Sequence, residues 1–213
     1  MEINRMESYT GILNILKPPG MTSHDVIAFV RRTLQLKKAG HTGTLDPGVA
    51  GVLPVCLGRA TKIIEYLPDT IKGYRAEVTF GRTTDTQDGF GRTEAVHDAS
   101  QLTREQAVHA ICRLKGEHLQ VPPMVSAVKY QGKKLYEIAR KGLEIERKAR
   151  PISIFEINPI GFSGFGSPNP RVLFDIVCSR GTYVRTICHD IGQELGFGGH
   201  MSFLIRTQSG NFK

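Results

Sequence analysis

The sequence has 213 residues, of which 40% are hydrophobic and 23% charged, so it is long enough for one sizeable domain of ordinary globular composition. No apolar run approaches the roughly 18 residues that a membrane-spanning helix needs, and the first residues lack the charged-then-apolar pattern of a secretory signal. We therefore expect a cytoplasmic protein that does not bind membranes. The net charge of +8 favours a polyanionic partner, although such a charge also occurs on solvated surfaces.

Cysteine and histidine spacings do not match the common metal-binding and disulfide frameworks. The four cysteines, Cys56, Cys112, Cys178 and Cys188, include no Cys-x-x-Cys pair, and the seven histidines form no ligand cluster. We predict reduced and mostly buried thiols, no metal site and no disulfide framework.

The N-terminal part of the chain predicts a strand followed by a helix. Residues 11–20 are an apolar run that ends in a Pro-Pro-Gly turn. Thr22 and Asp25 have the spacing of a capping box, and the apolar residues after them recur at helical intervals.

Residues 39–58, AGHTGTLDPGVAGVLPVCLG, are the most unusual stretch of the chain. Glycines allow positive φ angles and close approach of a ligand, and Pro47 keeps Asp46 out of the helical region. This pattern predicts a carboxylate at the tip of a tight loop, anchored by the apolar residues that follow. The alternative is an ordinary Asp-Pro-Gly turn whose side chain caps its own backbone.

The middle of the chain predicts short elements. Residues 59–67 are typical of a short amphipathic helix, and residues 74–80 alternate like a half-buried strand that begins at Tyr74. A tyrosine in that position more often serves packing than chemistry. Residues 84–91 predict a polar, glycine-rich loop without the acidic spacing of a calcium-binding EF-hand. A second capping box, at Thr103, opens another helix.

A basic segment occupies residues 129–150, with eight Lys or Arg and three Glu, a net charge of +5. Charge concentrated in this way favours a surface that follows phosphate groups over a random solvated face. The candidate binding residues in this segment are Lys129, Lys133, Lys134, Arg140 and Lys141.

The C-terminal part predicts two strands, at 152–160 and 171–179, and a helix at 182–195. The helix has an apolar stripe with a four-residue repeat, formed by Tyr183, Ile187, Ile191 and Leu195. Arg185 lies off this stripe, so it is either solvated or able to reach a carboxylate. Because strands and helices do not alternate regularly, we predict an α+β fold with a mixed, largely antiparallel sheet and flanking helices.

Six stretches, in the family's order and over nearly the whole chain, resemble bacterial TruB-type tRNA pseudouridine synthases. They are GILNILKPPGMTSHDV (11–26), GHTGTLDPGVAGVLPVCLGRATK (40–62), KGYRAEVTFGRTTDTQDGFG (72–91), VPPMVSAVKYQGKKLYEIARKG (121–142), CSRGTYVRTICHDIG (178–192) and HMSFLIRTQSG (200–210). The succession of GHTGTLDP and CSRGTYVRT is the most specific feature. The resemblance implies the pseudouridine synthase catalytic fold over residues 1–213, with a mobile RNA-binding insertion at about residues 121–150.

The resemblance implies a reaction as well. A uridine in the T loop of tRNA, uridine-55 in the family's nomenclature, is flipped out and converted to pseudouridine without a cofactor. Asp46 matches the catalytic aspartate, acting either as nucleophile or as base, and Arg185 matches the arginine that pairs with it. Tyr74 matches the tyrosine that stacks on the flipped base and helps remove the C5 proton.

The remaining family positions imply how RNA is held. His41 matches the residue that fills the space left by the base, and Leu204 matches an apolar residue that lines the pocket. Tyr183 is a further candidate for a pocket wall, although its helical phase also fits core packing. The basic segment lies where the family closes over the T arm, so we expect a monomer that binds tRNA without a guide RNA. One departure from the family is LIRTQSG in place of LRRTRSG at 204–210. The other is that the sequence stops at Lys213, where the family usually continues into a C-terminal PUA-type RNA-binding domain, so we expect this domain to be absent unless the sequence is a fragment.

Three alternatives remain open. The first is a subunit of the related RNA-guided pseudouridine synthases, which share the Asp loop. The second is a non-catalytic RNA-binding or RNA-folding module, for which basic charge alone suffices. The third is a glycoside hydrolase, but such enzymes usually use two carboxylates, and only Asp46 lies in a motif of catalytic character.

Overall fold

The computed structural model describes residues 9–67 and 71–213, which form two compact units. Unit 1 contains the described residues of Met1–Tyr74 and Leu204–Lys213, and unit 2 contains Arg75–Phe203. Two strands pass from one unit to the other, β4 (Ile71–Phe80) and β12 (Gly199–Ser209).

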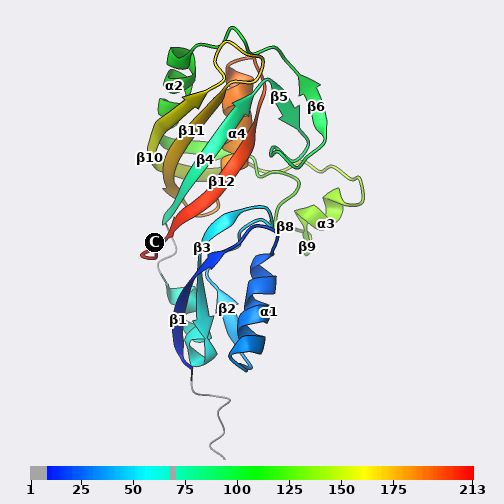
Figure 1. Cartoon of the computed structure of the whole chain (residues 1–213). Coiled ribbons are helices and arrows are strands. Elements are labelled where there is room, and N and C mark those ends of the chain that lie inside the picture. Colours follow the sequence, from blue (N-terminus) through cyan, green and yellow to red (C-terminus); the bar gives the residue numbers. More distant parts are fainter. Residues whose placement is uncertain (1–8, 68–70) are drawn as a thin grey trace, which may run out of the picture. The chain divides into compact units, whose positions relative to one another are not determined.

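Unit 1 is a small sheet with one α-helix packed on it (Figure 1). Besides the ends of β4 and β12, its elements are β1 (Gly11–Lys17), α1 (Ser23–Thr33), β2 (Ala39–His41), β3 (Ala50–Leu57) and the 3-10 helix η2 (Gly58–Tyr66). Strand β3 is central, because it pairs antiparallel with β1 and β2 and parallel with β12.

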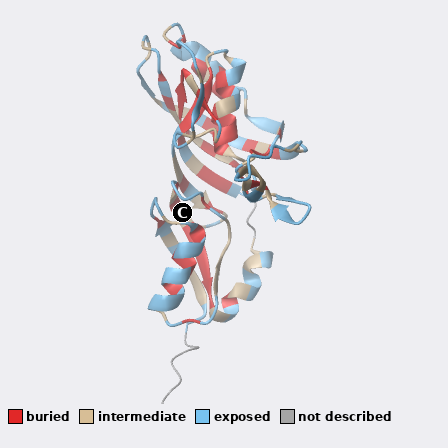
Figure 2. Cartoon of the chain, turned by 90° about the vertical axis from the view of Figure 1, so that its right-hand side faces the viewer, coloured by how far each residue is buried: buried red, intermediate tan, exposed pale blue. Residues whose placement is uncertain are grey.

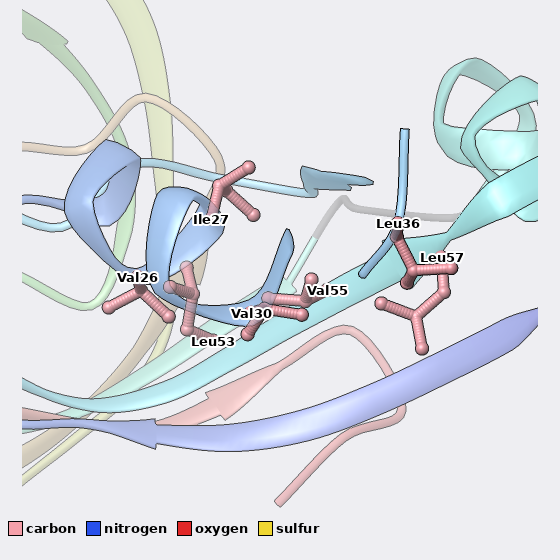
Figure 3. Packing of buried hydrophobic residues seen from close by; sticks show 7 residues of the cluster. All are labelled: Val26, Ile27, Val30, Leu36, Leu53, Val55 and Leu57. Carbon is pink, nitrogen blue, oxygen red and sulfur yellow. The ribbon is translucent and has the colours of Figure 1, made fainter. Parts of the chain in front are cut away.

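The core of unit 1 forms where α1 packs on β3 (Figure 3). The helix begins at the predicted capping box, in which the Thr22 and Asp25 side chains each bind the other residue's backbone N–H. Burying one aliphatic side chain in this core contributes about 1.5–3 kcal/mol to the stability of the fold. The buried residues of this cluster are Val26, Ile27, Val30, Leu36, Leu53, Val55 and Leu57.

Unit 2 contains a sheet in the order β12-β4-β11-β10-β7, in which β10 pairs antiparallel with both neighbours. Helix α2 packs on β10 and α4, and buried residues gather on the strands of each unit (Figure 2). Two further pairs, β5–β6 and β8–β9, lie off the sheet. The elements are β5 (Arg82–Thr84), β6 (Thr93–Val96), α2 (Arg104–Cys112), β7 (Gly116–Gln120), β8 (Lys129–Tyr130), β9 (Lys133–Lys134), α3 (Leu135–Ala139), β10 (Arg150–Ser163), β11 (Arg171–Ser179) and α4 (Val184–Glu194).

The predicted α+β class, with a mixed and largely antiparallel sheet, is confirmed. The short helix predicted at 59–67 is present as the 3-10 helix Gly58–Tyr66. Strand β12 was not predicted from its pattern, since the consecutive apolar residues 203–205 hide the alternation that marks a half-buried strand. Three of the four cysteines are buried and Cys112 is exposed.

Within the described residues, no helix is long and apolar enough to cross a bilayer. In the same part of the chain, no three side chains of the types that bind metals lie close enough together to form a site.

Candidate active site

Asp46 lies in the loop between β2 and β3, residues 42–49, which we call the Asp46 loop. The side chain is exposed, whereas its neighbours Leu45 and Val49 are only 4% and 5% exposed and anchor the loop in unit 1. The Val49 N–H donates to the Asp46 carbonyl at 3.0 Å, which closes the turn. The carboxylate therefore sits at the accessible tip of a loop whose base is packed.

A buried arginine fixes the backbone of this loop. Arg206, 2% exposed, donates Nε to the Val52 carbonyl at 2.8 Å. Its Nη1 and Nη2 donate to the carbonyls of Thr44 and Gly43, each at 3.2 Å. Because the guanidinium is planar and presents its donors in a fixed fork, these bonds set the direction of the chain just before Asp46.

A buried lysine and a serine hold the other side of the loop. Lys17, fully buried, donates Nζ to the Pro47 carbonyl at 3.2 Å and to two carbonyls of the turn after β1. The Ser23 hydroxyl accepts from the Leu45 N–H at 2.9 Å. Burial lowers the pKa of the Lys17 ammonium, and the negative charge of Asp46 acts in the opposite direction and raises it.

Strand β12 can approach β3 closely because residue 51 is a glycine. Gly51 has a φ of +132°, and a Cβ atom there would lie 2.3 Å from the Arg206 carbonyl oxygen. A side chain would force the strands apart. The same pairing places Leu204, half-buried, one residue before the pair formed by Ile205 and Ala50.

His41 and Tyr74 also belong to unit 1. His41 is half-buried at the end of β2, and its buried Nδ1 makes no hydrogen bond within the described residues. Burial, together with the nearby charges of Arg206 and His24, lowers the pKa of the His41 imidazole, which favours the neutral form. Tyr74 is half-buried on β4.

Arg185 lies in unit 2, in the first turn of α4, and is only 5% exposed, so the solvated alternative is wrong. Its Nη1 lies 3.7 Å from Oδ2 of Asp88, and its Nη2 donates to the Val125 carbonyl. The guanidinium carbon lies 5.8 Å from the centre of the Tyr183 ring, a cation–π distance. The pairing of Arg185 with Asp46 stays a prediction.

Two residues near Arg185, namely Asp88 and Gln120, hold the backbone in place and were not singled out from the sequence. Asp88 Oδ1 accepts from the Thr86 hydroxyl at 2.7 Å and from the Phe90 N–H at 3.0 Å, so the carboxylate also fixes its own loop. The Gln120 side chain accepts from the Tyr183 N–H at 2.8 Å and donates to the Tyr183 carbonyl at 3.1 Å. These two bonds tie β7 to the start of α4.

The basic segment presents its charges to solvent. Lys129, Lys133, Arg140 and Lys141 are exposed and Lys134 is half-buried. The segment is anchored by Leu135, which is 2% exposed. Lys134 and Arg140 both lie over the Tyr136 ring, at 5.5 and 5.4 Å.

Comparisons with known proteins agree with these features. The TruB family pseudouridylate synthase N-terminal domain matches residues 31–184, and the tRNA pseudouridylate synthase B C-terminal domain matches residues 185–213. The chain belongs to the TruB family of pseudouridylate synthases. The resemblance stated from the sequence is thus confirmed.

Curated TruB-family relatives are similar over almost the whole chain. The tRNA pseudouridine synthase B of Symbiobacterium thermophilum is 60% identical over 202 residues, 95% of this chain and 67% of the relative. That of Pelotomaculum thermopropionicum is 54% identical over 203 residues, 95% of this chain and 64% of the relative. The chain therefore spans about two thirds of the length of these relatives.

Solved structures share the fold. A chain from a Cbf5-Nop10-Gar1 complex is 35% identical with a TM-score of 0.72, over 96% of this chain and 50% of that chain. A chain from an H/ACA RNP bound to a substrate RNA containing 2'-deoxyuridine is 31% identical with a TM-score of 0.69, over 96% and 49%.

The two buried cations that support the Asp46 loop in this TruB-family chain could in part have been identified from the sequence. Lys17 ends the mostly apolar strand β1, and Arg206 directly follows the apolar run at 203–205 of β12; a charge in such a position is buried only when it is bound. The sequence marks such residues as unusual, but Arg206 binds carbonyls more than 150 positions away, and Lys17 binds Pro47 as well as its near neighbours. Only the folded structure identifies those partners.

Proposed function

We propose that this chain isomerises a uridine in the tRNA T loop, uridine-55 in the family's nomenclature, to pseudouridine. The observation that carries the proposal is the exposed carboxylate of Asp46 in a TruB-family chain, on a loop that two buried cations hold rigid. An acid held in this way is accessible to a substrate and needs no ordering before reaction.

The proposed reaction begins when the target base leaves its stack and enters the site. The bond between N1 and C1′ breaks, the uracil turns, a bond forms between C5 and C1′, the C5 proton leaves, and N1 takes up a proton. Asp46 acts at the sugar, either by attacking C1′ or by removing a proton that allows a glycal to form. While it is still ionised, its negative charge stabilises the positive charge that develops near C1′ as the glycosidic bond breaks.

The other predicted residues have supporting roles in this proposal. Tyr74 stacks on the flipped base and assists loss of the C5 proton, and Arg185 supplies positive charge to the reaction. His41 fills the space that the base leaves, and Leu204 and Tyr183 form walls of the pocket. The neutral His41 imidazole suits insertion between stacked bases, because an uncharged ring loses less hydration.

We propose that the basic segment, within the insertion at about residues 121–150, holds the T arm through phosphate contacts. Of the five candidate binding residues in this segment, four are exposed and Lys134 is half-buried, which supports this role. Such contacts position an RNA without identifying its sequence. The proposed partner is a tRNA bound by a monomer without a guide RNA.

The test is release of tritium from C5-labelled uridine in an unmodified T-arm stem-loop, with wild type compared with Asp46→Asn under single-turnover conditions. We expect release by the wild type and none by the variant. Binding without release by either would indicate a non-catalytic RNA-binding module. Equal release by both would remove Asp46 from the mechanism.

A guide-dependent activity is the second candidate, because the solved structures that share the fold come from Cbf5 and H/ACA RNP assemblies. The same assay distinguishes it. Release from a stem-loop without any added RNA supports the stand-alone enzyme, whereas release only after a complementary guide is added supports the second candidate.

A further inference from the structure

Gln87 has an unusual backbone in the loop between β5 and β6, residues 85–92, which we call the Asp88 loop. Its φ is +63°, a conformation that glycine adopts easily and that glutamine rarely adopts. The Gln87 N–H donates to the Thr84 carbonyl at 3.0 Å, so the conformation belongs to a closed turn. A residue other than glycine at a positive φ angle persists when its surrounding contacts stabilise it.

One such contact is a hydrogen bond to helix α4. The Thr186 hydroxyl, on a residue that is 4% exposed, donates to Oε1 of Gln87 at 2.7 Å. Thr186 directly follows Arg185, and Gln87 directly precedes Asp88. Two consecutive residues of the loop are therefore joined to two consecutive residues of the helix, one pair by a hydrogen bond and the other by charge.

The backbone on both sides of Asp88 is also fixed, in both cases by the same residue of β12. The Met201 N–H donates to the Gln87 carbonyl at 3.0 Å, and the Gly89 N–H donates to the Met201 carbonyl at 2.9 Å. These bonds hold the loop against β12. The hydrogen bond between the Thr186 and Gln87 side chains, together with the Arg185–Asp88 ion pair, joins the loop to α4.

We propose that Gln87 and Thr186 are a positioning pair that aims the Arg185 guanidinium and the Asp88 carboxylate for the reaction. The Arg185–Asp88 distance of 3.7 Å is longer than a hydrogen bond and constrains direction weakly. The hydrogen bond from the Thr186 hydroxyl to Gln87 Oε1, at 2.7 Å, depends more strongly on direction. The inference rests on the proposed function, because it assigns this pair to the step in which Arg185 takes part.

The test compares variants that remove the bond with variants that keep it. Thr186→Val removes the donor and conserves shape, and Thr186→Ser conserves the donor. Gln87→Gly removes the acceptor while relieving the backbone, so loss of folding does not obscure the result. We expect Thr186→Val and Gln87→Gly each to lower the single-turnover rate of tritium release about tenfold, with RNA affinity within about twofold of wild type.

The double variant should react no more slowly than the slower single variant, and Thr186→Ser should react like wild type. A normal rate in Thr186→Val would overturn the inference alone. Parallel falls in rate, RNA affinity and melting temperature would assign the pair a merely structural role and would overturn it too. A wild-type chain that releases no tritium would overturn the proposed function, and this inference with it.

Discussion

The Asp46 loop of unit 1 and the start of α4 in unit 2 arrange charge in opposite ways. In unit 1 the proposed reacting group is exposed, and buried cations, Lys17 and Arg206, hold the backbone around it. In unit 2 the proposed functional cation, Arg185, is itself buried and is bound by Asp88 and by a backbone carbonyl.

The two units differ in whether the group proposed for the reaction also stabilises the fold. The hydrogen bonds from Lys17 and Arg206 to the Asp46 loop go to backbone carbonyls, so replacing the Asp46 carboxylate leaves these bonds in place. Arg185 cannot change in the same way, because removing one partner of a buried ion pair leaves the other without compensation. We therefore expect mutations to separate activity from stability in unit 1 and to couple them in unit 2.

The largest expected effect is that of Asp46→Asn. This change conserves shape and removes the charge, so single-turnover tritium release should fall on the order of 10⁴-fold, while the melting temperature stays the same. Glu65→Gln, at an exposed carboxylate elsewhere in unit 1, is the matched control and should react normally. A clear loss of stability in Asp46→Asn would contradict the separation that we infer for unit 1.

Arg206→Met should have the next largest effect and act first on folding. The three carbonyls that Arg206 binds would lose their donors inside the protein, so the free energy of unfolding should fall by about 3–5 kcal/mol. Urea denaturation measures this. Arg206→Lys keeps the charge but not the planar set of guanidinium donors, so its free energy of unfolding should lie between those of wild type and Arg206→Met. Unchanged stability in both variants would show that the loop has other support.

Arg185→Gln tests the coupling expected in unit 2. Both tritium release and stability should decrease, the latter by about 2–3 kcal/mol, because Asp88 would keep a largely buried charge. The double variant Arg185→Gln/Asp88→Asn should regain part of the stability but none of the activity. If Arg185→Gln loses activity and keeps its full stability, the two units do not differ in the way proposed.

Lys133→Gln and Lys141→Gln should affect binding only. Each removes one exposed charge of the basic segment, so affinity for the T-arm stem-loop should weaken a few-fold, and the slope of log K against log salt should decrease by about 1 per change. Filter binding over a salt series measures this. Lys115→Gln, exposed outside the segment, is the control. A fall in the rate at saturating RNA would instead place these residues in the chemistry.

The smallest expected effect is a dependence of stability on pH. Burial lowers the pKa of His200, whose ring binds Arg82, and burial lowers that of His41. The unfolded chain binds these protons below about pH 6.5 while the folded chain does not, so stability is full above that pH and is lost as the pH falls. Urea denaturation at pH 7.5 and 5.5 should show the loss, and His41→Gln and His200→Gln should each reduce it. A flat profile in wild type would contradict both assignments.

Local features of this fold could be predicted from the sequence, because they depend on neighbours in the chain. The capping boxes at Thr22 and Thr103, the strand at Arg171–Ser179 and the exposed position of Asp46 are of this kind. The partners of Arg206 and Arg185 could not be predicted, because they lie more than fifty residues away and depend on tertiary contacts. The same limit applies to the role of Gln120, whose partner Tyr183 lies 63 positions away.

The bonds between Arg206 and the Asp46 loop link residues 162 and 163 positions apart, which has a consequence for biosynthesis. The loop leaves the ribosome early, yet the guanidinium that fixes it is translated roughly 10 to 30 s later at about 5–20 residues per second. Until then the nascent chain carries Asp46 on a loop that lacks its two hydrogen bonds from Arg206. A partly synthesised chain should therefore be unable to modify RNA, and competence should appear only after the last strand of the sheet has been translated.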